Sequence, residues 1–231
     1  MPIDIQALKS GLIVSCQPVK GGAMDNAVMV VGFALAAIDG GAAGLRVESA
    51  DYVAAVRKAT PRPIIGLIKR DLDDSSVRIT PWLEDVEALA AAGADIIAYD
   101  ATQRPRPVAT RVLVDAIHAR GRLAMADCSI IADAEQALAE GADIVGSTLA
   151  GYTGSVEPTE PDFALIGAMR RLTPYVVAEG NIRTPKQASQ ALVAGASMVV
   201  VGSAITRPEH VTGWFRAALD ETVAKAGARW P

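Results

Sequence analysis

The chain has 231 residues, of which 51% are hydrophobic and 21% charged, and its formal net charge is −4. This length suits one α/β barrel, and the composition is that of a folded globular protein. No basic stripe or run of Lys and Arg is present, so we expect no binding to nucleic acid. No apolar run reaches the roughly 18–20 residues that cross a bilayer, so we expect no membrane contact.

Two cysteines, Cys16 and Cys128, lie far apart in the sequence. They predict neither a disulfide framework nor a zinc site. The first residues lack a basic region followed by an apolar stretch, so we expect no signal peptide. A reducing cytoplasm is the simplest location for such a chain.

Short apolar runs alternate along the chain with amphipathic segments. In chain order, we predict strands over residues 11–17, 43–47, 63–69, 95–100, 122–127, 143–148, 175–179 and 198–202. Helices are predicted between them, most clearly over 131–140 and 185–194, where apolar positions are spaced three and four apart. Strands that are each followed by a helix predict a parallel sheet. The pattern favours a closed (βα)8 TIM barrel, in a single domain over residues 1–231, with an open doubly wound sheet as the alternative.

A weak internal repeat agrees with this barrel. A Gly-Ala pair precedes each even-numbered predicted strand, at Gly41, Gly93, Gly141 and Gly195. Glycine suits the end of a helix, where it adopts the left-handed conformation at little cost. We therefore interpret these glycines as structural.

The active site of such a barrel lies at the carboxyl ends of its strands. Polar residues at those ends are Gln17, Arg46, Glu48, Lys69, Asp100, Asp127, Ser147, Thr148, Glu179 and Ser203. Lys69 and Glu179 directly end apolar strands, where an unpaired charge would be costly. Pairing the two with each other would meet that cost and would create a proton-transfer site. Asp100 could instead cap the following loop, and Gln17 could simply satisfy backbone groups.

The two histidines are weaker candidates for catalysis. His118 falls within a predicted helix and His210 at the start of the last one, and we expect both at the surface. No group of His, Asp and Glu has the spacing of metal ligands, so the sequence calls for no metal.

Apolar side chains also mark the end of the chain. They are Val211, Trp214 and Phe215 in the last predicted helix and Trp230-Pro231 at the tail. These residues could cover the barrel or pack on a partner chain. Aromatic residues at helical spacing favour packing on the barrel.

The loops after the last two predicted strands contain glycine, at the place where barrels often bind phosphate. Glycine lets the backbone approach an anion, and free N–H groups at a helix start attract it. Arg207 could add a charged contact. The phosphate-binding residues predicted here are Gly180, Asn181, Gly202, Ser203 and Arg207. The alternative is that these glycines only form tight turns.

Several motifs resemble those of one enzyme family. They are GLIVSCQ at 11–17, GLIKRD at 66–71, ITP at 79–81, DATQRPRP at 100–107, MADCS at 125–129, STLAGYT at 147–153, AEGNI at 178–182 and VVVGSAITRP at 199–208. With them the chain resembles the bacterial N-acylmannosamine-6-phosphate 2-epimerases of sialic acid and amino-sugar catabolism. It departs from the pattern at Val47-Glu48-Ser49, in the loop after Gln17, and at Asn181, where a basic residue is frequent.

The resemblance implies a (βα)8 fold, a homodimer, a small sugar-phosphate substrate and no cofactor. It implies epimerisation at C2 of N-acetylmannosamine 6-phosphate by deprotonation and reprotonation. Lys69 matches the catalytic lysine of the family and Glu179 its partner carboxylate, whereas Gln17, Arg46 and Asp127 match positions that contact the substrate.

Lys69 must be partly neutral to act as a base. Burial and Arg46 would lower its pKa, and Glu179 would raise it. The sequence does not decide between these effects. Two other functions also remain open. One is an aldolase or decarboxylase that forms a Schiff base on Lys69, and the other is a non-catalytic sugar-phosphate sensor.

Overall fold

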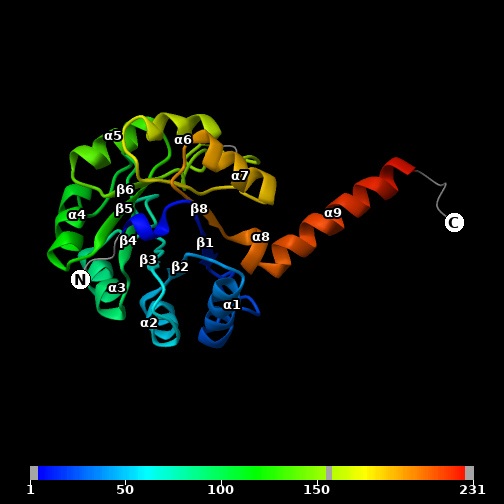
Figure 1. Ribbon diagram of the computed structural model, residues 1–231, viewed down its shortest axis with the longest axis horizontal. Helices are drawn as coiled ribbons and strands as arrows, with labels where there is room; N and C mark the ends of the chain where they lie inside the picture. Colours follow the sequence, from blue (N-terminus) through cyan, green and yellow to red (C-terminus); the bar gives the residue numbers. More distant parts are fainter. Residues whose placement is uncertain (1–4, 155–157, 227–231) are drawn as a thin grey trace.

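The computed structural model describes residues 5–154 and 158–226. Its eight strands are parallel and close into a barrel in the order of the sequence (Figure 1). They are β1 (Gly11–Cys16), β2 (Gly44–Glu48), β3 (Ile64–Leu67), β4 (Ile96–Asp100), β5 (Leu123–Asp127), β6 (Ile144–Gly146), β7 (Val176–Ala178) and β8 (Met198–Val201). Each predicted strand is present, and the closed (βα)8 barrel is confirmed over the open sheet.

Helices surround this barrel (Figure 1). They are α1 (Ala27–Asp39), α2 (Ala50–Ala59), α3 (Leu83–Ala92), α4 (Thr110–Ala119), α5 (Ile131–Ala139), α6 (Phe163–Arg170) and α7 (Pro185–Ala194). A 3-10 turn, η1 (Ile5–Leu8), precedes β1, and α8 (Ser203–Thr206) and α9 (Pro208–Ala226) follow β8. The helices predicted over 131–140 and 185–194 are therefore confirmed as α5 and α7. Within the described ranges, no helix has the length and apolar character needed to cross a membrane.

The ends of α7 show how local sequence sets the helix bounds. Thr184 lies just before the helix, and its side chain accepts a hydrogen bond from the backbone N–H of Gln187. Pro185 occupies the first helical position, where its missing N–H costs nothing. Gly195 ends the helix with a φ of 115°. Gly41, Gly93 and Gly141 also have positive φ values, so their predicted structural role is confirmed.

Alternation of side chains along the strands decides what lies inside the barrel. Apolar residues such as Ile65, Ile96 and Met125 belong to the cluster that fills the interior. Successive residues of a strand point to opposite faces, so every second residue points inward. Lys69 therefore lies on the same side of its strand as Ile65, and Asp127 on the same side as Met125. The barrel is apolar below and polar at the carboxyl ends of its strands.

The last helix does not cover the barrel, and the prediction that its aromatic residues pack there is wrong for Phe215. Figure 1 shows α9 projecting away from the ring of helices, and Phe215 is 71% exposed. The cause lies in the residues before it. Pro208 disfavours a helical conformation at Arg207, which has φ −121° and ψ 82°, so α9 starts in a new direction. Trp230-Pro231 lies outside the described residues.

Candidate active site

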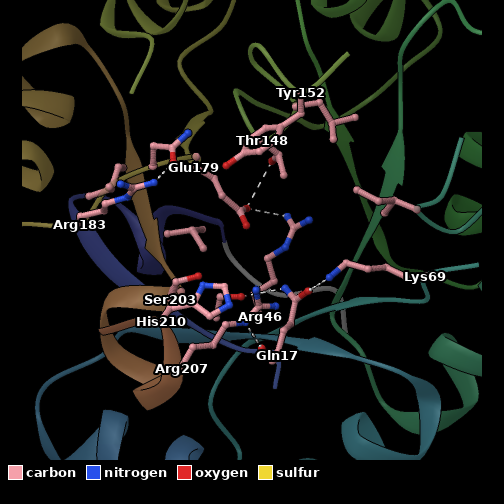
Figure 2. Close-up of a pocket in the computed structure, with 18 of the residues that line it drawn as sticks. Gln17, Arg46, Lys69, Thr148, Tyr152, Glu179, Arg183, Ser203, Arg207 and His210 are labelled. Carbon is pink, nitrogen blue, oxygen red and sulfur yellow. Dashed lines mark hydrogen bonds and ion pairs between the residues drawn. The ribbon is translucent and has the colours of Figure 1, made fainter. Parts of the chain in front are cut away.

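A cavity of about 500 Å³ opens at the carboxyl ends of the strands. Nine of the predicted site residues line it, and these are Gln17, Arg46, Lys69, Glu179, Gly180, Asn181, Gly202, Ser203 and Arg207. The tenth, Asp127, lies beneath the cavity wall with its side chain fully buried. Residues chosen from the ends of the predicted strands therefore do gather around one cavity. Figure 2 shows Arg46 in the middle of the cavity, Lys69 on one side, and Arg183 and Arg207 on the other.

A buried arginine and two carboxylates form the floor of the site. Both terminal nitrogens of Arg46 donate to Asp127, at 3.1 Å from Nη1 to Oδ1 and 2.7 Å from Nη2 to Oδ2. Nη1 of Arg46 also lies 2.9 Å from Oε2 of Glu179. Thr148 donates its hydroxyl to Oδ1 of Asp127 at 2.6 Å and is 3.3 Å from Oε2 of Glu179. Pairing and hydrogen bonding of this kind are what buried charges require.

Glu179 is the carboxylate of this group that reaches the cavity. Its pKa is raised to about 6, mainly by burial and also by the nearby charge of Asp127. Arg46, Lys69 and the hydroxyl of Thr148 act in the opposite direction. Glu179 can therefore change its protonation state close to neutral pH.

Lys69 has different partners from the one predicted. Its Nζ donates to Oε1 of Gln17 at 2.7 Å and to Oε2 of Glu48 at 2.9 Å. The predicted pairing of Lys69 with Glu179 is wrong, because Glu179 pairs with Arg46 instead. Glu48 ends β2, which adjoins β3 with Glu48 opposite Leu67, so its side chain is close to Lys69. The long side chain of Arg46 reaches across the barrel from β2 to Glu179, which follows β7.

Burial lowers the pKa of the Lys69 ammonium. Glu48 opposes that shift, whereas the positive charges of Arg207 and Arg46 add to it. The expectation that burial and Arg46 lower the pKa is confirmed. The carboxylate that raises it is Glu48, which was expected near the end of the second strand but was not predicted to be the partner of Lys69.

Two loops form the other end of the cavity. Gly180 and Asn181 follow β7 with positive φ values of 111° and 53°. Gly202 follows β8 and precedes α8, and a Cβ atom at Gly202 would lie 3.3 Å from Cβ of Ser15. Arg207 donates from Nε to the backbone oxygen of Gln17 at 2.7 Å, which joins the end of α8 to the end of β1.

Some residues that line the cavity were missed. They include Ser15, Thr148, Arg183, His210 and Trp214. His210 is half-buried, so its expected surface position is wrong, whereas His118 is exposed as expected and lies 2.8 Å from Asp143. Thr148 was noted at the end of a predicted strand but was given no role in the site. Trp214 could not have been found from the sequence, because its position depends on the direction in which α9 leaves the barrel.

Asp100 serves the loop that follows it. Its side chain is buried and accepts hydrogen bonds from the backbone N–H and the hydroxyl of Thr102. Arg104 and Arg106 also pair with it. The alternative that Asp100 caps its loop is therefore confirmed. In residues 5–154 and 158–226, no three His, Cys, Asp or Glu side chains gather as they would to hold a metal ion.

Comparisons with known proteins identify the family of this chain. The family model described as "Putative N-acetylmannosamine-6-phosphate epimerase" matches residues 30–221. A Photobacterium profundum protein named "Putative N-acetylmannosamine-6-phosphate 2-epimerase" is 52% identical over 216 residues, which cover 94% of this chain and 92% of that protein. A Brucella melitensis protein named "Bifunctional enzyme NanE/NanK" is 56% identical over 222 residues, which cover 96% of this chain and 43% of that protein. The chain thus spans less than half the length of the Brucella relative.

The fold comparison points the same way. The solved structure of the N-acetylmannosamine-6-phosphate 2-epimerase from Clostridium perfringens is 38% identical to this chain, with a TM-score of 0.90. The match covers 94% of this chain and 97% of that one. The chain belongs to the N-acetylmannosamine-6-phosphate epimerase family.

Proposed function

We propose that this chain is an isomerase that converts N-acetylmannosamine 6-phosphate to N-acetylglucosamine 6-phosphate by cofactor-independent epimerisation at C2, in amino-sugar and sialic acid catabolism. The observation that carries the proposal is the cavity itself. A lysine with a lowered pKa lies near a buried Arg46–Glu179 pair, and glycine loops with Arg207 line the same cavity. The activity in the names of the Photobacterium and Clostridium relatives supports it.

The reaction needs only proton transfer. In the open-chain sugar, the C2 proton is acidic because C2 is bonded to the C1 aldehyde. Neutral Lys69 takes this proton, and the electron pair of the C–H bond forms a C1=C2 double bond while O1 becomes negative. A proton then returns to the opposite face of C2, the electrons move back, and O1 is again a carbonyl oxygen. The reaction is redox-neutral, and a base, an acid and stabilisation of O1 are sufficient for it.

The remaining residues have roles that follow from their positions. Glu179, with its pKa of about 6, assists ring opening or exchanges the second proton. Arg46, which the buried Asp127 holds through two hydrogen bonds, orients the hydroxyl and acetamido groups, and Gln17 holds the amine of Lys69. The phosphate group is bound by Gly180, Asn181, Gly202, Ser203 and Arg207.

Proton NMR in D2O tests the proposal. The purified chain is incubated with N-acetylmannosamine 6-phosphate, and we expect N-acetylglucosamine 6-phosphate with deuterium at C2. Absence of both product and exchange would overturn the proposal. Binding of the sugar phosphate without turnover would indicate a sensor, and borohydride trapping of an adduct on Lys69 would indicate an aldolase or decarboxylase.

We also propose that residues 1–231 act as one unit in a cytoplasmic homodimer in which α9 packs on the barrel of the second copy. Phe215, Leu219 and Val223 lie four residues apart on one face of α9 and are 71%, 61% and 54% exposed. An apolar groove of about 390 Å³ lies on the outer side of β8 and β1, next to α7. Its apolar lining includes Leu12, Ala188, Leu192, Val199, Val201 and Ile205. An apolar helix face and an apolar groove on the same chain would be buried together in a symmetric pair.

Light scattering on the full chain tests this arrangement. We expect a mass of two chains of 24.0 kDa, and a single-chain mass would contradict it. Phe215→Glu on the helix and Leu192→Glu in the groove should each give the single-chain mass. Leu172→Glu is a matched control, because Leu172 is also exposed, at 42%, but does not line the groove. Dissociation by the control alone would contradict the proposed contact.

A further inference from the structure

The charges around the cavity are unevenly balanced. Arg46 is paired with Asp127 and Glu179, and Lys69 is paired with Glu48. The catalytic end therefore carries more carboxylates than cations. Two other cations line the cavity, Arg183 and Arg207. Neither forms an ion pair with a carboxylate of the described residues.

Arg183 is held in place without a counter-charge. Its Nη2 donates to Oδ1 of Asn181 at 3.0 Å, and its guanidinium lies 4.9 Å from the ring centre of Trp214. Stacking on an aromatic ring orients a guanidinium while leaving its edge free. A guanidinium has five N–H donors, and the described contacts use one of them. The side chain is therefore oriented at the cavity with donors to spare.

We propose that Arg183 is a phosphate-binding residue of this chain, which together with Arg207 binds the phosphate monoester of the substrate; this inference rests on the function proposed above. A phosphate monoester carries between one and two negative charges at neutral pH. The two arginines match that charge, and their planar donor groups suit phosphate oxygens. In Figure 2, Arg183 is drawn at the upper left of the cavity and Arg207 at the lower left, with Ser203 between them.

Backbone geometry explains why position 183 carries the charge. Asn181 has a φ of 53°, in the left-handed region that asparagine tolerates better than long side chains do. An arginine at this position would be strained, whereas Arg183 lies two residues further along the same loop. Asn181 thus accepts the left-handed turn and holds the guanidinium through its own side chain. The loop supplies a cation to the cavity from a residue that does not bear the backbone strain.

The test compares Arg183→Ala with Lys186→Ala. Lys186 is a matched control because it lies on the same segment, is exposed, and does not line the cavity. With N-acetylmannosamine 6-phosphate, we expect Arg183→Ala to raise KM roughly tenfold, the loss typical of one partly exposed charge-assisted hydrogen bond, while kcat changes less than about twofold. Lys186→Ala should keep both constants. The difference in KM should shrink at high ionic strength, because salt screens a charge contact.

A second measurement does not depend on turnover. Inorganic phosphate binding is followed by calorimetry for the unaltered chain and both variants, and we expect weaker binding for Arg183→Ala alone. This result would support the inference even if the sugar phosphate were not epimerised. Equal phosphate affinity in the unaltered chain and Arg183→Ala would overturn it, as would a fall in kcat without a change in KM. Arg183→Gln, which keeps the length of the side chain, replaces Arg183→Ala if the latter does not fold.

Discussion

The two ends of the cavity are built differently. At the catalytic end, the side chains of Arg46 and Asp127 are 2% and 0% exposed, and each charge has a charged partner. In the rest of the lining, Arg183 and Arg207 form no ion pair with a carboxylate of residues 5–154 and 158–226, and the glycine residues Gly180 and Gly202 also line the cavity. The charges of Arg46 and Asp127 are buried and paired with each other. Arg183 and Arg207 have no ion-pair partner among the described residues and can bind an anion.

This difference separates two kinds of effect. A buried charge that loses its partner is costly, because the remaining charge has neither water nor a counter-ion. A partly exposed cation without a counter-charge costs the folded protein little to keep or to remove. We therefore expect changes at the catalytic end to affect stability and kcat. Changes at the phosphate end should affect mainly KM.

The largest effect should come from Lys69→Ala. The substitution removes the proposed base, and general acid–base groups commonly contribute a factor of about 10² to 10⁴ in rate. We expect the rate of C2 proton exchange in D2O to fall by a factor of about 10³ or more. Lys186→Ala is the control for loss of a lysine outside the cavity. Near-normal exchange by Lys69→Ala would show that another group removes the proton.

Asp127→Ala should cause the largest loss of stability. Asp127 makes two hydrogen bonds with Arg46, and its removal leaves that buried guanidinium with Glu179 alone. Breaking a buried pair from one side typically costs about 3–5 kcal/mol. The free energy of unfolding in urea measures this loss.

Asp115→Ala is the matched control for Asp127→Ala. Asp115 also pairs with an arginine, Arg111, but both side chains are 60% exposed. Exposed pairs of this kind contribute about 0–1 kcal/mol. Similar losses in the two variants would show that burial does not distinguish the two ion pairs.

Acid should reduce activity through Glu179. Its pKa is raised from an ordinary 4.5 to about 6, so the carboxylate form is lost as pH falls through about 6. If this carboxylate accepts a proton during ring opening, kcat/KM should fall about tenfold for each pH unit below that value. Glu179→Gln should be slow at every pH and should lack this acid limb. An acid limb that persists unchanged in Glu179→Gln would assign it to another group.

The fold and most of the site could be predicted because both depend on local patterns. Strand ends are marked by the change from apolar to polar residues, and that change selected Gln17, Lys69, Asp127 and Glu179. The barrel closes in sequence order, so these ends meet. Which charges pair across the cavity depends on strand adjacency and side-chain reach. For this reason the partner of Lys69 was predicted incorrectly.

Local sequence patterns also could not predict the direction of the last helix. Trp214 and Phe215 are adjacent in a helix whose composition suits packing on a barrel. The conformation of Arg207 before Pro208 directs that helix away, so Trp214 lines the cavity while Phe215 is exposed. The backbone conformation at Arg207 therefore determines which apolar side chains of α9 contact the cavity and which are exposed.

The smallest effect should come from Glu48→Gln, which removes the charge beside Lys69 while keeping a side chain of the same size. Glu48 raises the pKa of Lys69, so its neutralisation should lower that pKa further. More of the lysine is then neutral at a given pH, and the rise of kcat/KM with pH should move to lower pH. The shift should be small, because the two side chains are 28% and 27% exposed and water screens their interaction.

Glu87→Gln is the control for this last variant, since Glu87 pairs with Arg120 on the surface and does not line the cavity. Its pH profile should match that of the unaltered chain. A Glu48→Gln profile that moves to higher pH would mean that Glu48 does not act on Lys69 through its charge. The lowered pKa of Lys69 would then come from burial, Arg207 and Arg46 alone. The pairing of Lys69 with Glu48 would stabilise the fold and would not adjust the pKa of the base.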